Sequence, residues 1–315
     1  MDGDRRLSLA VAATIFLFLA VQLGALALVR PFLSAGYQAV EDPSDPRNSV
    51  AYVLAILVMT GVILAIVKLG AKRFLRGTVT VMSGFLSFYV FSVVVPPVFV
   101  VDGINVGAWA FAAALTLALY FYPEWYVIDT AGVIIGAAGA GLFGISFGPL
   151  PAIVLLGLLA VYDAIAVYRT EHMLTLAESV TDLKLPLVLV IPLTLSYSFL
   201  EQDEAVDTEG QEPAERDAFF IGLGDTVMPT IMVASAAFFV DAPSLGVPVI
   251  ALNLPALTAM VGTIGGLSVL LWLVMKGKPH AGLPLLNGGA IGGYLVGALA
   301  AGVPLVEAVG LAPYF

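Results

Sequence analysis

The chain has 315 residues, of which 60% are hydrophobic and 11% are charged, whereas ordinary soluble domains carry roughly 25% charged residues. This composition excludes a soluble globular protein, because too much apolar surface would face water. The sequence contains no cysteine, which excludes disulfides and thiolate metal sites, and its two histidines, His172 and His280, stand beside charged residues. We therefore expect no metal site. The net charge of −10 is mostly local, because residues 201–217 hold eight acidic residues and one arginine.

Nine apolar segments predict an all-α, polytopic bundle of transmembrane helices. The predicted spans are residues 7–29, 49–69, 78–100, 104–122, 127–147, 149–169, 219–240, 254–275 and 283–303. The first span follows Arg5 and Arg6, but it is too long for the apolar region of a signal peptide, and we expect it to be retained. Pro149 and Pro151 separate spans five and six, since proline removes a backbone donor and restricts the preceding residue.

The stretch between spans six and seven is of a different kind. Residues 185–200 are apolar but too short to span and contain two prolines, so we expect a re-entrant or interfacial segment. The acidic residues 201–217 predict a solvated loop. We therefore expect one domain over 1–315, with spans one to six within 1–170, the interfacial segment and loop at 171–218, and spans seven to nine within 219–303.

Basic residues indicate the orientation. With the N-terminus inside, eleven of the thirteen Lys and Arg residues fall on the inner side, and only Arg30 and Arg47 fall outside. Inner loops carry the excess of basic residues, so we predict an inner N-terminus and an outer C-terminus. Small residues recur every four positions at 132–144 in span five and at 289–297 in span nine, and such stripes predict close helix packing.

Two aspartates, Asp163 and Asp225, lie within the apolar spans and clear of their ends. A carboxylate at such a depth costs at least about 2.5 kcal/mol, so both are functional candidates. Each lies about six residues from the inner end of its predicted span, roughly 9 Å at the rise of an α-helix, which would bring the two face to face. Asp129 lies near the start of span five, where we favour an interfacial cap over a functional role.

Two neighbouring carboxyl groups share one proton near neutral pH. One member can then activate water to attack a peptide carbonyl while the other donates a proton to the carbonyl oxygen, as in an aspartyl protease. Two other readings of a buried pair stay open on burial alone. One is a neutral structural pair, and the other is proton or cation transport by a channel or transporter, which predicts ion flux without peptide cleavage.

The residues around the aspartates resemble a known family. Tyr162 precedes Asp163, and Gly222, Leu223 and Gly224 precede Asp225. This pair of motifs is similar to the YD and GxGD signatures of the presenilin and signal peptide peptidase family, and the likeness extends over most of the chain, including the presenilin orientation.

The resemblance implies an archaeal or bacterial presenilin homologue in which Asp163 and Asp225 form the catalytic dyad. Tyr162 would position a carboxylate or the substrate, and the two glycines would let a backbone approach Asp225. Type IV prepilin peptidases also use a GxGD motif, but they usually carry a basic residue after the aspartate, where this chain has Thr226 and Val227.

The third motif of the family is Pro-Ala-Leu at the start of the last span. A literal Pro255-Ala256-Leu257 begins span eight, but on the outer side, across the membrane from the aspartates. We therefore assign the motif to Pro284-Leu285-Leu286, which begins span nine on the inner side, with leucine replacing alanine. By resemblance, Pro284 exposes backbone that pairs with an unwound substrate. Residues 185–191 can supply a strand there, although packing against lipid explains them as well.

The resemblance also implies the partners. We expect substrates to be transmembrane helices of other proteins in the lipid bilayer, with no metal or organic cofactor and no nucleic-acid partner. A homo-oligomer is compatible with the sequence. No organelle targeting signal is visible, so we expect a multi-pass protein of a prokaryotic plasma membrane.

Overall fold

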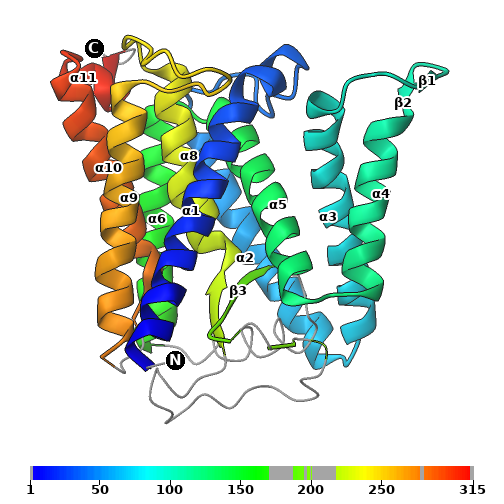
Figure 1. The fold of residues 1–315 in the computed structure, drawn as a ribbon. Coiled ribbons are helices and arrows are strands. Elements are labelled where there is room, and N and C mark those ends of the chain that lie inside the picture. Colours follow the sequence, from blue (N-terminus) through cyan, green and yellow to red (C-terminus); the bar gives the residue numbers. More distant parts are fainter. Residues whose placement is uncertain are drawn as a thin grey trace.

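The computed structural model describes residues 3–169, 187–194, 197–198, 200, 218–276 and 280–312. Its elements are, in chain order, α1 (Gly3–Ser34), α2 (Arg47–Lys68), α3 (Lys72–Val94), β1 (Val100–Val101), β2 (Ile104–Asn105), α4 (Val106–Phe121), α5 (Trp125–Ser146), α6 (Pro149–Arg169), β3 (Val188–Pro192), β4 (Ala218–Gly222), α8 (Leu223–Phe239), α9 (Leu254–Val274), α10 (Gly282–Ala300) and α11 (Leu305–Ala308). They form a helical bundle with the two termini at opposite ends, and α3 and α4 stand to one side (Figure 1).

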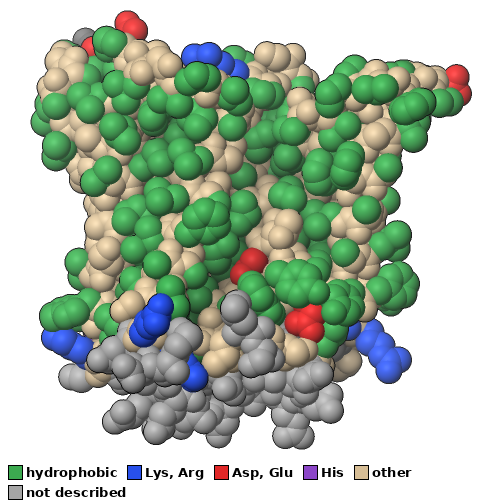
Figure 2. All heavy atoms as spheres, in the orientation of Figure 1, with side chains coloured by type: hydrophobic (Ala, Val, Ile, Leu, Met, Phe, Trp, Pro, Cys, Tyr) green, Lys and Arg blue, Asp and Glu red, His purple; other side chains and the backbone are tan. Residues whose placement is uncertain are grey.

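Each predicted span overlaps one helix of the described chain. Seven of these helices are long and apolar enough to cross a membrane, whereas α4 and α8 have 16 and 17 residues. The outward faces are apolar, and on α2 the side chains of Leu54, Val58 and Met59 are all more than half exposed. Figure 2 shows hydrophobic side chains over the middle of the molecule. An exterior of this kind is suited to lipid, and the chain is an integral, multi-pass membrane protein.

Glycines bring α9 and α10 into backbone contact. A Cβ atom at Gly289 would overlap the carbonyl oxygen of Gly262, and one at Gly293 would overlap the carbonyl oxygen of Thr258. Residues larger than glycine would separate the two helices, because a backbone carbonyl cannot rotate away as a side chain can. The predicted close packing of the 289–297 stripe is confirmed.

The small residues of α5 serve two neighbours. A Cβ atom at Gly144 would overlap the side chain of Ala234 on α8, and one at Gly132 would lie 2.8 Å from Leu189 Cδ2 on β3. The 132–144 stripe is therefore a packing surface, as predicted. It lets α5 run along both α8 and the β3 strand.

Two short antiparallel strand pairs correct the expectation of an all-α chain. β1 and β2 pair between α3 and α4. β3 pairs antiparallel with β4, with Val190 opposite Phe220, and β3 lies toward the end of the bundle that holds the N-terminus (Figure 1). The described part of the expected interfacial segment 185–200 thus contains a strand, while the predicted acidic loop 201–217 lies outside the described residues.

The predicted start of span seven at residue 219 is wrong. Residues Ala218–Gly222 form β4, and the helix α8 begins only at Leu223. Phe219, Phe220 and Ile221 belong to residue types that favour strands, and they find a partner in β3. Gly222, with φ −59° and ψ 132°, is the residue at which the extended backbone turns into the helix.

Candidate active site

Asp163 is held at the start of another helix. It lies on α6, is 6% exposed, and its Oδ2 accepts a hydrogen bond of 3.0 Å from the N–H of Leu283. The N–H of Gly282 is also directed at this carboxylate. Both N–H groups belong to the first turn of α10, where backbone donors lack partners within the helix. The positive end of the helix dipole favours a negative charge there, so the apolar bundle offers this carboxylate a polar cradle.

Asp225 reaches the same place from α8. It lies in the first turn of that helix and is partly exposed. Its Oδ2 lies 3.4 Å from where a Cβ atom at Gly282 would be and 3.5 Å from a Cβ atom at Gly222. Asp163 binds the N–H of Leu283, the residue directly after Gly282. The two carboxyl groups therefore meet beside the first residues of α10.

The depth argument that paired the aspartates is only half right. Asp163 lies about six residues from the end of α6 at Arg169, as predicted. Asp225, in contrast, is the third residue of α8, because the residues before Leu223 are in β4. What places Asp225 is therefore the end of a strand rather than a turn and a half of helix.

The Pro284-Leu285-Leu286 stretch lies beside the aspartates, and Pro255 does not. Pro284 follows directly on Leu283, whose N–H binds Asp163. Pro255 packs against the far part of α10, since its Cα lies 2.9 Å from a Cβ atom at Gly297. Gly297 is fourteen residues beyond Leu283, roughly 21 Å along a helix.

The other motif residues have distinct surroundings. Gly222 is close to the Asp225 carboxyl, whereas a Cβ atom at Gly224 would meet nothing within 4 Å. Leu223 is buried, and a Cβ atom at Gly136 on α5 would lie 3.2 Å from its Cδ1. Tyr162 is partly exposed. Close helix packing thus explains Leu223, but it gives no reason for a glycine at 224.

Three contacts were not foreseen from the sequence. The backbone N–H groups of Gly282 and Leu283 face Asp163, and Tyr168 Oη accepts a hydrogen bond of 3.4 Å from the N–H of Ala281. Backbone donors leave no trace in residue type. The only signal was their position next to Pro284.

A cavity opens beside Asp225. It has a volume of about 200 Å³ and lies between α1, β4, α9 and the start of α10, with His280 and Gly282 in its wall. The rest of its lining is largely apolar, from residues such as Val11, Leu267 and Leu270. A space of this character suits an apolar side chain next to a carboxyl group.

Two aspartates that lie together at the polar start of a helix, inside an apolar bundle, suit an aspartyl protease that works within the membrane. The family described as "Signal-peptide peptidase, presenilin aspartyl protease" matches residues 15–303, and the chain belongs to this family.

Solved structures agree. The chain is similar to a presenilin family intramembrane aspartate protease solved in space group C222, with 38% identity, a TM-score of 0.68, and coverage of 92% of this chain and 99% of the other. A second structure of such a protease, in space group P2, gives 38% identity, a TM-score of 0.65, and coverage of 92% and 97%. No curated protein sequence gives a significant match.

Proposed function

We propose that Asp163 and Asp225 are the catalytic dyad of this intramembrane aspartyl protease. The observation that carries the proposal is the meeting of both carboxyl groups at the first turn of α10. The family gives the activity, hydrolysis of peptide bonds in transmembrane helices. It does not favour a channel or transporter, nor a prepilin peptidase.

In the proposed mechanism the two carboxyl groups share one proton. The ionised member takes a proton from water, which attacks the peptide carbonyl carbon, and the protonated member donates to the carbonyl oxygen. Breakdown of the tetrahedral intermediate returns a proton to the leaving amine. The N–H groups of Gly282 and Leu283 at Asp163 orient that carboxylate, so Asp163 enters the cycle with its geometry fixed.

The motif residues would position the substrate. Pro284-Leu285-Leu286 lies at the start of α10 beside the proposed dyad, where backbone N–H groups have no partner within the helix and Pro284 is tolerated because it has no N–H. The open space at Gly224 would admit substrate backbone close to Asp225. Tyr162, Gly222 and Leu223 would complete the positioning shell.

For the membrane topology we propose nine spans with an inner N-terminus and an outer C-terminus. Nine apolar helices in the described residues and termini at opposite ends of the bundle (Figure 1) support this arrangement. So do the Lys and Arg side chains near the lower end in Figure 2, on the positive-inside rule. The prokaryotic plasma membrane, and a homo-oligomeric state, remain proposals from the sequence.

The test is cleavage of a tagged single-span substrate by the purified protein, with product masses that locate the cut. We expect Asp163→Asn and Asp225→Asn each to abolish cleavage with unchanged thermal unfolding. Asp241→Asn is the matched control, because Asp241 is an exposed aspartate just after α8. Cleavage that survives both dyad substitutions would refute the assignment.

A further inference from the structure

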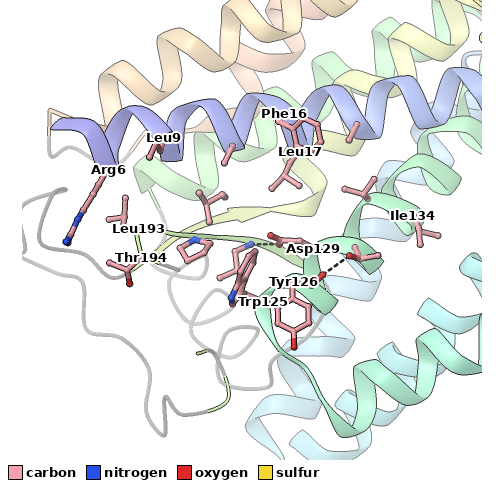
Figure 3. Close-up of a pocket in the computed structure, with 17 residues that line it drawn as sticks. Arg6, Leu9, Phe16, Leu17, Trp125, Tyr126, Asp129, Ile134, Leu193 and Thr194 are labelled. Carbon is pink, nitrogen blue, oxygen red and sulfur yellow. Dashed lines mark hydrogen bonds between the residues drawn. The ribbon is translucent and has the colours of Figure 1, made fainter. Parts of the chain in front are cut away.

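A buried carboxylate outside the dyad holds β3 against α5. Asp129 lies in the second turn of α5, is 8% exposed, and its Oδ1 accepts a hydrogen bond of 2.7 Å from the backbone N–H of Val190. Figure 3 shows its side chain pointing from α5 to the strand, in the wall of a groove between α1, α5 and β3. The interfacial cap expected from the sequence is therefore wrong, because the carboxylate binds a distant backbone.

A second carboxylate, just before α5, binds the chain a few residues after β3. Glu124, just before α5, is 6% exposed, and its Oε1 accepts a hydrogen bond of 2.6 Å from Ser198 Oγ. Next to the Asp129–Val190 contact, Leu189 packs directly onto Gly132 of α5. The start of α5 thus fixes the chain of β3 and the residues after it at several points.

The position of β3 is transmitted to Asp225. β3 pairs with β4 over five residues, from Val188–Gly222 to Pro192–Ala218. The ladder then continues into α8, because the N–H of Leu223 donates to the carbonyl oxygen of Leu187 at 2.8 Å. Asp225 follows only two residues later. A strand that is fixed on α5 therefore fixes the first turn of α8.

The same contact occupies a backbone donor on one edge of β3. In an antiparallel pair, alternate residues turn their backbone groups away from the partner strand, and Val190 is one of these because its N–H faces Asp129. Pro192, two residues on, shares this edge and has no N–H to offer. An incoming strand would therefore lack both of these donors on this edge.

We propose that Asp129 is a positioning residue, which fixes β3 on α5 and through β4 sets the place of Asp225. It acts through the strand pair and does not touch the dyad. The functional part of this inference rests on the proposed role of Asp225, while the structural part stands on the contacts themselves.

The experiment compares Asp129→Ala, Asp129→Asn and Thr130→Val. Asparagine keeps an acceptor oxygen for Val190, and alanine does not. Thr130 lines the same groove but donates to Tyr126 O within its own helix, so Thr130→Val controls for the loss of a polar group there. Thermal unfolding of each variant is measured alongside.

The first readout is amide hydrogen exchange at Val190 and at Leu223. Loss of a hydrogen bond to a charged group corresponds to an acceleration of about ten- to a hundredfold. We expect this in Asp129→Ala at both amides, and little change in Asp129→Asn and Thr130→Val. Acceleration at Val190 alone would overturn the transmission to α8, whether or not the protein cleaves a substrate.

The second readout is the kinetics of cleavage. We expect Asp129→Ala to lower kcat about tenfold or more with a smaller change in KM, and Asp129→Asn to restore most of it. Unchanged kcat in Asp129→Ala, with an active wild type, would overturn the positioning role and leave the dyad assignment intact. A wild type that cleaves nothing would instead count against the dyad, and the exchange data would still decide the structural part.

A cross-link provides a test in case Asp129→Ala is unstable. The chain has no cysteine, so Gly132→Cys with Leu189→Cys can tie α5 to β3 at their existing contact. In the Asp129→Ala background we expect oxidation to restore slow amide exchange at Leu223 and cleavage together, and reduction to remove both. Equal cleavage rates in the oxidised and the reduced protein would refute the inference.

Discussion

The contact between α9 and α10 gives a prediction that two adjacent glycines can test. Gly289 faces α9, where a Cβ atom would overlap the carbonyl oxygen of Gly262 and lie 2.9 Å from its carbonyl carbon. Gly288 is exposed, and a Cβ atom there would meet nothing within 4 Å. Alanine at these two positions adds the same methyl group to the same helix, so the difference between the variants isolates the interhelical contact.

The magnitude follows from the overlap. Ordinary contact of a Cβ atom begins at about 3.4 Å, so the carbonyl carbon of Gly262 must retreat by half an ångström and its oxygen by more. Because both partners are backbone, the helices must move apart, and overpacking of this kind typically costs about 1–3 kcal/mol. Gly288→Ala should instead gain up to about 1 kcal/mol from helix propensity. We expect the two variants to differ by about 2 kcal/mol or more.

The assay is thermal unfolding of both variants in the same detergent, together with cleavage of a single-span substrate. A gap of 2 kcal/mol corresponds to several degrees in Tm. Gly289→Ala should also reduce cleavage, because α10 carries the Leu283 N–H that binds Asp163. Equal Tm values for the two variants would refute the claim that glycine at 289 is required by backbone contact with α9.

Four further predictions concern the site and its support. Gly224→Ala should change the free energy of unfolding by no more than about 1 kcal/mol but slow cleavage, because its Cβ enters open space beside Asp225. An unchanged rate would mean that substrate does not use this space. Gly282→Leu should abolish cleavage, since the side chain would compete for space with Asp225 and Leu270, whereas Gly282→Ala, at ordinary contact distance, should retain part of it; full activity of the leucine variant would contradict the site geometry. Tyr294→Phe should lower the free energy of unfolding by about 1–3 kcal/mol, because the buried hydroxyl donates to Ala308 O at 2.5 Å, and should spare the cleavage rate measured below the unfolding range. A chelator should leave cleavage unchanged, because in the proposed mechanism the two carboxyl groups activate water themselves. Inhibition that added metal reverses would overturn a purely carboxylate mechanism.

The helices were predictable because each is a long apolar run that is bounded by a proline or a charged residue. Span six is predicted at 149–169 and observed as Pro149–Arg169, since Pro149 suits the first turn of a helix and Arg169 marks the membrane edge. Span three is less accurate. It was predicted at 78–100 but is observed at Lys72–Val94, because Pro96 and Pro97 end the helix and the apolar residues beyond them are outside it.

The assignment of the third motif used the predicted membrane orientation as well as the match to Pro-Ala-Leu. Pro255-Ala256-Leu257 matches the family's letters, and Pro284-Leu285-Leu286 does not. The basic residues predict which end of each span is inside, and that prediction selected Pro284. In the structure Leu283, beside Pro284, binds Asp163, whereas Pro255 packs at Gly297. The uneven distribution of Lys and Arg thus identified the stretch beside Asp163 better than a match to the letters of the motif did.

Residues 185–191 were offered as a strand, but β4 and its pairing with β3 could not be read from the sequence, and the reason bears on the mechanism. Residues Ala218–Gly222 are apolar and run without a break into α8, so hydropathy joins the two, and their strand partner lies about thirty residues earlier in the chain. Only Gly222 and Gly224, on either side of Leu223, indicate that the backbone changes there from strand to helix. Because α8 starts where the strand ends, Asp225 takes its place from the sheet, and the sheet takes its place from the Asp129 contact on α5. Asp129, which lies on the helix before the one that carries Asp163 and outside every motif named above, thus helps to set the geometry of the proposed dyad.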